Sequence, residues 1–168
     1  LAPLRIPFRK MTGAFWGQCL TRAIEMVIDD EAPEYILTMD YDSVFTRNDV
    51  EALMSTALRH PEADAIAPVQ VSRTRSTPLF TLPGDDGKAR STIDRDELAN
   101  DLVQARTAHF GLTLIKTAAI AKLPRPWFYG KPDAEGRWGD ERVDDEPVDV
   151  LARRLGQLGD HDGGVDAE

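Results

Sequence analysis

Two aspartates separated by one residue are the residues in this sequence best suited to chemistry. Asp40 and Asp42 directly follow the apolar segment Tyr35 to Met39, and in an extended chain residues two apart project from the same side. Two carboxylates placed in this way repel each other unless a cation or a proton lies between them, and Mg²⁺ and Mn²⁺ favour oxygen ligands. The spacing therefore predicts a divalent-metal site, and the alternative is a solvated acidic turn after a strand.

A strand has to position these carboxylates, and the neighbouring segments indicate what surrounds it. Tyr35 to Met39 has the composition of a strand buried on both faces, and ligands bind at the carboxyl ends of strands in open α/β sheets. Apolar spacing predicts a helix over residues 13–28, and Thr46 begins a second helix by capping it. Ala65 to Val71 is a second apolar segment, so strand, helix and strand follow one another as in a βαβ crossover.

These elements predict an α/β fold with three layers and a mostly parallel sheet. The sheet centres on residues 35–39, with residues 65–69 parallel beside it and residues 112–115 in the same sheet. We expect one domain over residues 1–158 and a disordered tail over residues 159–168. The remaining expected elements are short: a strand over 79–82, loose alternation over 102–107, and helices over 117–122 and 148–158.

Composition narrows the class of protein. The chain has 168 residues, 42% hydrophobic and 29% charged, with a net charge of −9, so a basic nucleic-acid surface is not expected and an anionic substrate needs a local cation. No apolar run reaches the length of about 20 residues that a membrane-spanning helix needs. Cys19 stands alone at helical spacing and is expected in the core, without a disulfide. We expect a cytoplasmic protein.

The order of the motifs resembles glycosyltransferase family 2 and its relatives with the GT-A fold. The resemblance covers roughly residues 13–146 and depends on Asp40-Tyr41-Asp42, AIAPVQ, HFGLTLIKTAAIAKLPRPWF and a late acidic pair. It implies transfer of a sugar from a nucleotide diphosphate donor, with Mn²⁺ or Mg²⁺ as the cofactor, to an unknown glycan, lipid or protein acceptor. We expect a partial version, truncated or inactive, that lacks the N-terminal nucleotide-binding strand and the usual C-terminal end.

The resemblance also assigns roles to single residues. Asp42 would ligate the metal, and Asp40 would hold the donor ribose or a metal-bound water. Asp145, with Asp144 beside it, occupies the place of the general base that deprotonates the acceptor hydroxyl. Inversion at the anomeric carbon is favoured because one base suffices for direct displacement. Asp144 and Asp145 are equally suited to be solvated acids at the N-terminus of a helix.

Three further positions have two interpretations each. Gly111, at a strand start, is a candidate for cofactor binding. His109, just before it, is a candidate for contact with the donor phosphates or the metal, or a packed, hydrogen-bonded histidine. Trp127 and Trp138 are candidates for an acceptor platform, or ordinary packing residues.

Two other functions remain open from the sequence. Asp40 to Val44 also satisfies the signature of haloacid-dehalogenase-like phosphatases, in which the first aspartate is the nucleophile. The third possibility is a non-catalytic module that binds a sugar nucleotide with Mn²⁺ and turns nothing over.

Overall fold

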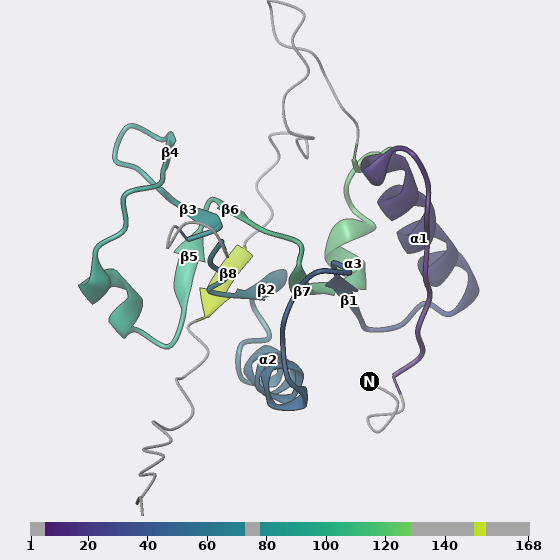
Figure 1. Ribbon diagram of the computed structural model, residues 1–168, viewed down its shortest axis with the longest axis horizontal. Helices are drawn as coiled ribbons and strands as arrows, with labels where there is room; N and C mark the ends of the chain where they lie inside the picture. Colours follow the sequence, from purple (N-terminus) through teal and green to yellow (C-terminus); the bar gives the residue numbers. More distant parts are fainter. Residues whose placement is uncertain (1–5, 73–77, 129–149, 154–168) are drawn as a thin grey trace, which may run out of the picture.

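The computed structural model describes residues 6–72, 78–128 and 150–153 (Figure 1). Three helices, eight strands and a short 3₁₀ helix over Arg95–Ala99 lie in these residues. In chain order the helices and strands are α1 (Trp16–Asp30), β1 (Tyr35–Met39), α2 (Arg47–Arg59), β2 (Ala65–Pro68), β3 (Phe80–Pro83), β4 (Ala89–Arg90), β5 (Val103–Ala105), β6 (Thr107–Ala108), β7 (Leu112–Lys116), α3 (Thr117–Ile120) and β8 (Val150–Arg153).

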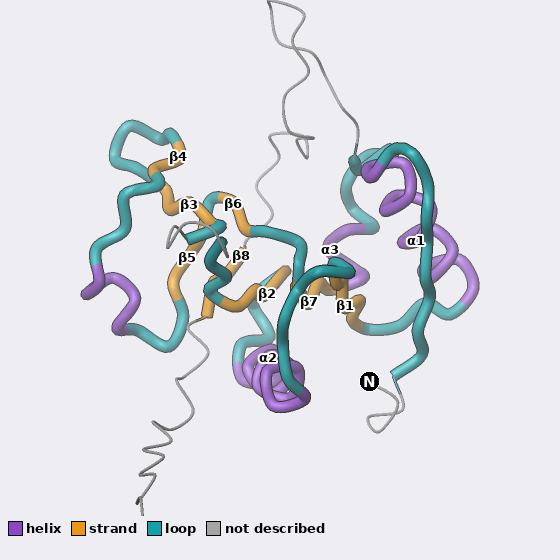
Figure 2. Tube along the Cα trace, in the orientation of Figure 1, coloured by secondary structure: helices purple, strands orange, loops and turns teal. Residues whose placement is uncertain are grey.

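The larger sheet has the strand order β1-β7-β2-β8-β5. Strand β7 pairs antiparallel with both β1 and β2, so β1 and β2 run in the same direction but do not pair with each other. Among the described strands, β2 and β8 form the parallel pair, whereas β5 is antiparallel to β8. A second, antiparallel sheet has the order β4-β3-β6 and lies above the β5–β8 end of the first in the view of Figure 2.

The predicted parallel three-layer sheet is therefore wrong, and the protein is a mixed α/β protein with mostly antiparallel strands. The spacing of residues 35–71 fits a crossover between two strands of equal direction. That spacing carries no information on whether a third strand lies between them. Here β7 fills that place, because its LTLIK segment is apolar on both faces and four of its five residues are buried.

Helix α2 begins at the capping box that the sequence predicts. The Asp49 backbone N–H donates to the Thr46 hydroxyl at 3.3 Å, and the Thr46 backbone N–H donates to the Asp49 carboxylate at 2.6 Å. The short helix predicted after Lys116 is present as α3.

The helix predicted over residues 148–158 is wrong where the structure describes this segment, because Val150–Arg153 forms strand β8. Strand β2, buried along its whole length, pairs with β8 from Ala65↔Val150 to Pro68↔Arg153. This tertiary pairing outweighs the helical spacing of the sequence. The tail at 159–168 lies outside the described residues.

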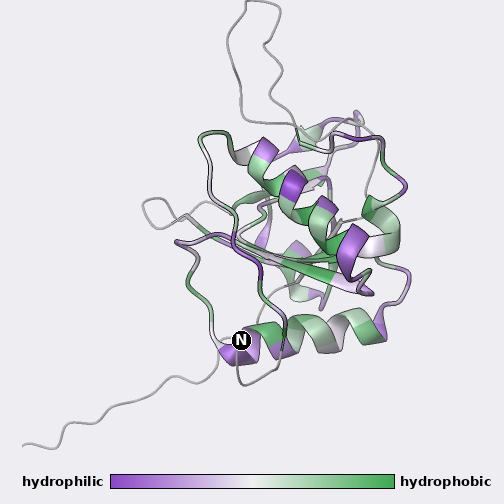
Figure 3. Cartoon of the chain, turned by 90° about the vertical axis from the view of Figure 1, so that its right-hand side faces the viewer, coloured by the Kyte–Doolittle hydropathy of each residue, from purple (hydrophilic) through white to green (hydrophobic). Residues whose placement is uncertain are grey.

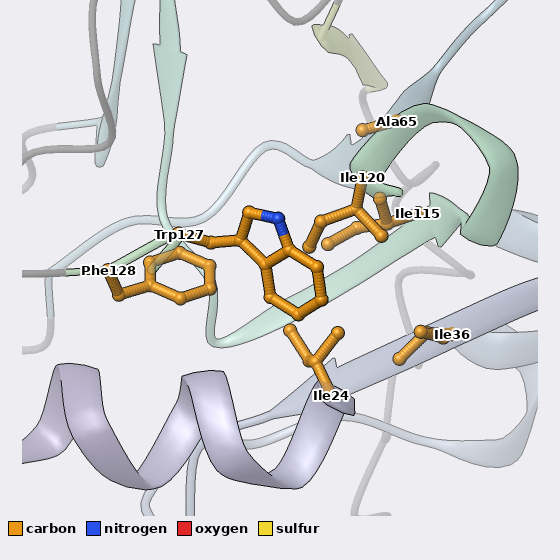
Figure 4. Packing of buried hydrophobic residues seen from close by; sticks show 7 residues of the cluster. All are labelled: Ile24, Ile36, Ala65, Ile115, Ile120, Trp127 and Phe128. Carbon is orange, nitrogen blue, oxygen red and sulfur yellow. The ribbon is translucent and has the colours of Figure 1, made fainter. Parts of the chain in front are cut away.

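Helices cover both faces of the strands β1, β7 and β2. On one face α1 and α3 contribute to a cluster of buried residues, shown in Figure 4: Ile24, Ile36, Ala65, Ile115, Ile120, Trp127 and Phe128. On the other face α2 packs on the sheet through a second set: Val50, Leu53, Ala57, Ala63, Ile66, Leu112 and Leu114. In Figure 3, α2 lies below the strands and α1 above them.

Candidate functional site

Three strands meet at one edge of the larger sheet, where β1 and β2 end and β7 begins. Because β7 is antiparallel to its two neighbours, its first residue Leu112 lies opposite Met39, the last residue of β1. Asp40 directly follows β1, Gln70 lies two residues after the end of β2, and Gly111 directly precedes β7. The Asp40 backbone N–H donates to the Gly111 carbonyl oxygen at 3.1 Å. The edge thus joins segments that are far apart in the sequence.

The Asp40 carboxylate faces the imidazole of His109. Asp40 Oδ2 lies 3.7 Å from His109 Nε2, and the two side chains are 25% and 44% exposed. This distance is too long for a direct hydrogen bond. The Asp40 carboxylate oxygen and the His109 ring nitrogen, both possible metal ligands, therefore face each other at a place that solvent reaches.

Gln70 holds His109 at this edge. The Gln70 side-chain Nε2 donates to the His109 carbonyl oxygen at 3.1 Å, and Gln70 Oε1 lies 3.3 Å from His109 Nδ1. The Gly111 backbone N–H donates to the same Nδ1 at 3.0 Å. Leu79 joins the two segments, because its N–H donates to Gln70 O at 2.8 Å and its carbonyl accepts from His109 N–H at 3.1 Å.

Gly111 is the point on which the polar side chains converge. A Cβ added there would lie 2.5 Å from Gln70 Oε1, 2.6 Å from Ser43 Oγ and 2.8 Å from His109 Nδ1. All three distances are shorter than a carbon atom tolerates, so glycine is required for this arrangement. Ser43 is placed by the turn after β1, since its backbone N–H donates to Asp40 O at 3.2 Å.

Asp42 lies in the same turn, exposed to solvent. Within residues 6–72, 78–128 and 150–153, no group of three or more His, Cys, Asp or Glu side chains is arranged to hold a metal ion. Asp40 and His109 would therefore be the two facing protein ligands of a cation at this edge, and the cation would take its other ligands from the neighbouring turn, from water or from a bound anion. The donor types fit, since metal bonds of about 2.1 Å place neighbouring ligand atoms roughly 3–3.5 Å apart.

The other candidate residues lie elsewhere or outside the described residues. Trp127 is 2% exposed and packs in the cluster of Figure 4. Its indole N–H donates to the Leu123 carbonyl at 3.2 Å, and the Arg125 guanidinium lies 4.8 Å from the ring centroid. This buried position favours the packing interpretation of Trp127 over an acceptor platform. Trp138, Asp144 and Asp145 lie outside the described residues.

Gln70 and Ser43 belong to this site but are not among the residues expected from the sequence. A usable signal exists for Gln70, which follows the apolar segment 65–69 in the way that Asp40 follows residues 35–39. Ser43 carries no comparable signal, because small polar residues are common in turns and its proximity to Gly111 depends on the inserted strand β7.

No described helix has both the length and the apolar character needed to cross a membrane.

Comparison with known proteins gives a fold likeness and no family. No protein-family model matches the chain, and no curated protein matches it. The crystal structure of the viral protein A197 from STIV is similar, with a TM-score of 0.50 and 14% identity over 84% of this chain. The chain spans about two thirds (65%) of that protein's length, and at this identity the likeness shows the fold alone.

Proposed function

We propose that this chain is a metal-dependent glycosyltransferase that binds a nucleotide diphosphate sugar at the Asp40 edge of its larger sheet. The observation that carries the proposal is the convergence of Asp40, His109 and Gly111, three residues that sequence reasoning named separately as cofactor-binding candidates. They contact one another through the Asp40–Gly111 backbone bond and the His109 ring.

The chemistry follows from charge. The protein carries a net charge of −9, so a diphosphate needs a cation at its binding site. Asp40 and His109 would hold that cation, and Asp42 in the exposed turn supplies a second carboxylate for it. A divalent cation stabilises the negative charge that gathers on a departing diphosphate. The absence of a side chain at Gly111 lets the Gln70, Ser43 and His109 side chains converge at the strand ends.

The chain's own residues supply the remaining steps of the proposal. Asp145 accepts the proton of the acceptor hydroxyl as that oxygen attacks the anomeric carbon, with inversion as the result. The acceptor is a glycan, a lipid or a protein hydroxyl. This role for Asp145 comes from the motif order in the sequence.

A thermal-shift screen tests the binding half of the proposal. Uridine, guanosine and cytidine diphosphates are added with and without Mn²⁺, and at least one should raise the melting temperature only when Mn²⁺ is present. Asp42→Ala should abolish the Mn²⁺-dependent shift, while melting without ligand stays the same or rises slightly because a like charge is removed. Asp30→Ala, at the exposed end of α1, is the matched control and should leave the shift unchanged.

Asp145→Asn separates binding from transfer. The nucleotide-dependent shift should survive this substitution, whereas sugar transfer or donor hydrolysis is lost. An unchanged shift in Asp42→Ala would contradict the proposed role of the Asp motif. Release of phosphate from small phosphoesters, without any nucleotide-dependent shift, would instead support the phosphatase alternative.

A further inference from the structure

We infer that His109 is a direct ligand of the cation at this site, together with Asp40, and that the site selects Mn²⁺ and related transition-metal ions over Mg²⁺. Gln70 acts as the positioning residue for the imidazole. The inference deepens the proposed function, because it names the cation and its ligands, but it depends on the protein's own side chains and not on the nucleotide.

The Asp40 and His109 side chains are close enough to share a cation. Asp40 Oδ2 and His109 Nε2 face each other at 3.7 Å, and both side chains are partly exposed. They come from different strand ends, and the Asp40 backbone N–H donates to the carbonyl oxygen of Gly111, two residues after His109. Ligand atoms that share a metal lie roughly 3–3.5 Å apart, so a cation requires the two side chains to approach by only a few tenths of an ångström.

The other ring nitrogen of His109, Nδ1, also has a partner suited to metal binding. A histidine that binds a metal through Nε2 carries its proton on Nδ1, and that N–H needs an acceptor. Gln70 Oε1 lies 3.3 Å from Nδ1 and is such an acceptor. Gln70 is itself held, because its Nε2 donates to the His109 carbonyl. The ring thus has the outer partner that metal-binding histidines require.

The same nitrogen also has a partner suited to the metal-free ring. The Gly111 N–H donates to Nδ1 at 3.0 Å, which requires an unprotonated Nδ1 and leaves the proton on Nε2, facing Asp40. Two partners of opposite character therefore compete for Nδ1. Cation binding selects the tautomer whose Nδ1–H donates to Gln70, and cation release selects the tautomer that accepts from Gly111.

The types of ligand at this site determine which cation it prefers. Imidazole nitrogen is a good donor for transition-metal ions, whereas Mg²⁺ takes oxygen ligands almost exclusively and dehydrates reluctantly. An imidazole nitrogen among carboxylate ligands therefore makes the site favour Mn²⁺. Had Asp40 and Asp42 been the facing pair, the donor set would have been oxygen alone and the preference weak.

His60 provides a matched control on the same chain. Its Nδ1 lies 3.0 Å from Glu62 Oε1, so it also faces a carboxylate, and its side chain is 33% exposed. It follows α2 and precedes β2, so it lies at the opposite end of β2 from Gln70. His60 and His109 thus each lie beside a carboxylate. Within the part of the chain that the structure describes, His109 is the one whose other ring nitrogen also faces a side-chain acceptor, Gln70 Oε1.

The test measures metal binding without nucleotide. The full chain is titrated with Mn²⁺, and free Mn²⁺ is followed by electron paramagnetic resonance. His109→Ala should weaken binding at least about tenfold, Gln70→Ala should weaken it by roughly tenfold while keeping the preference for Mn²⁺, and His60→Ala should change nothing. Mg²⁺ should displace Mn²⁺ only in large excess.

Two further measurements address folding and tautomer. His109→Gln exchanges the nitrogen donor for an oxygen donor, so the preference for Mn²⁺ over Mg²⁺ should fall even if binding persists, and its melting temperature shows whether the fold is intact. Nitrogen-15 NMR of the imidazole, with diamagnetic Zn²⁺ as the probe, should show the His109 proton moving from Nε2 to Nδ1 on binding.

The outcomes separate this inference from the proposed function. Mn²⁺ affinity equal in His109→Ala and the unsubstituted protein, or equal competition by Mg²⁺, would overturn the His109 site. Mn²⁺ binding that depends on His109, without any effect of nucleoside diphosphates on melting, would uphold the inference and reject the glycosyltransferase proposal. Nucleotide binding that needs Mn²⁺ but not His109 would do the reverse.

Discussion

Replacement of Gly111 by alanine should disrupt the candidate site while leaving the fold intact. The added methyl group would meet Gln70 Oε1, Ser43 Oγ and His109 Nδ1, all within 3.0 Å. Each of these atoms belongs to a side chain and not to the backbone, so the side chains rather than the sheet give way. Their displacement breaks the bond from Gln70 to His109 O and the bond from Gly111 N–H to His109 Nδ1.

The expected loss of stability follows from these two hydrogen bonds. Each contributes about 0.5–1.5 kcal/mol, so their loss costs roughly 1–3 kcal/mol, the range also found for overpacked sites. Alanine stabilises by about 0.4–1 kcal/mol through the unfolded chain where the backbone conformation is compatible. The net cost of Gly111→Ala should therefore be about 0.5–2 kcal/mol, measured by urea unfolding.

Gly87→Ala is the matched control. Gly87 has φ = 76° and open space around the position of a Cβ, so alanine there costs roughly 1–2 kcal/mol through left-handed backbone strain alone. The two variants should lose similar stability, but only Gly111→Ala should lose Mn²⁺ binding. This comparison separates damage to the site from general destabilisation.

A background with Gln70→Ala and Ser43→Ala removes two of the three obstructing atoms. The cost of Gly111→Ala should fall in that background, because neighbouring residues couple in a double-mutant cycle. An unchanged cost, or full Mn²⁺ binding by Gly111→Ala, would refute the view that these side chains converge on Gly111.

Three other predictions concern the fold. Thr46→Ala removes the cap of α2 and should cost about 1 kcal/mol in urea unfolding, with a larger loss if the helix does not shift its start. The hydrogen bond from Arg90 lowers the pKa of Glu97 from 4.5 to about 2, so this carboxylate stabilises the fold above pH 4.5 and its contribution is lost as the pH falls through about 2. Glu97→Gln should flatten the stability curve in that window, most visibly at low salt. Trp127→Ala should cost about 3–5 kcal/mol because the ring fills the core, and a variant as stable as the unsubstituted protein would contradict its burial.

Local features of the fold were accessible from the sequence. The helix stripe before β1, the Thr46 cap and the apolar strands depend on residue spacing within one segment, and each is present. The parallel sheet was not accessible in the same way, because pairing is a choice between distant segments. Strand β7 satisfies β1 and β2 at once, and no local pattern reveals that it lies between them.

The inserted strand also explains which part of the site was predicted. Asp40, His109 and Gly111 were named from their positions at strand ends, and an antiparallel β7 brings its own start to the ends of β1 and β2. The sequence paired Asp40 with Asp42, whereas the structure places Asp40 opposite His109. That neighbour depends on the position of β7 between β1 and β2. Gln70 belongs to the site for the same reason, since it follows the end of β2, and that end lies at the edge where β7 begins.

Amide hydrogen exchange provides a last test of how firmly this edge is held. Leu79 donates its N–H to Gln70 O and accepts from His109 N–H, so its peptide connects the two segments that carry the imidazole and its partner. We expect strong protection of the Leu79 and His109 amides. The exposed turn at Lys88, whose N–H donates only to the nearby Asp86 side chain at 3.0 Å in the described structure, should exchange fast. Since local opening sets these rates, exchange at Leu79 as fast as at Lys88 would mean that His109 is not held in place, and the two-donor cation site would lose its structural basis.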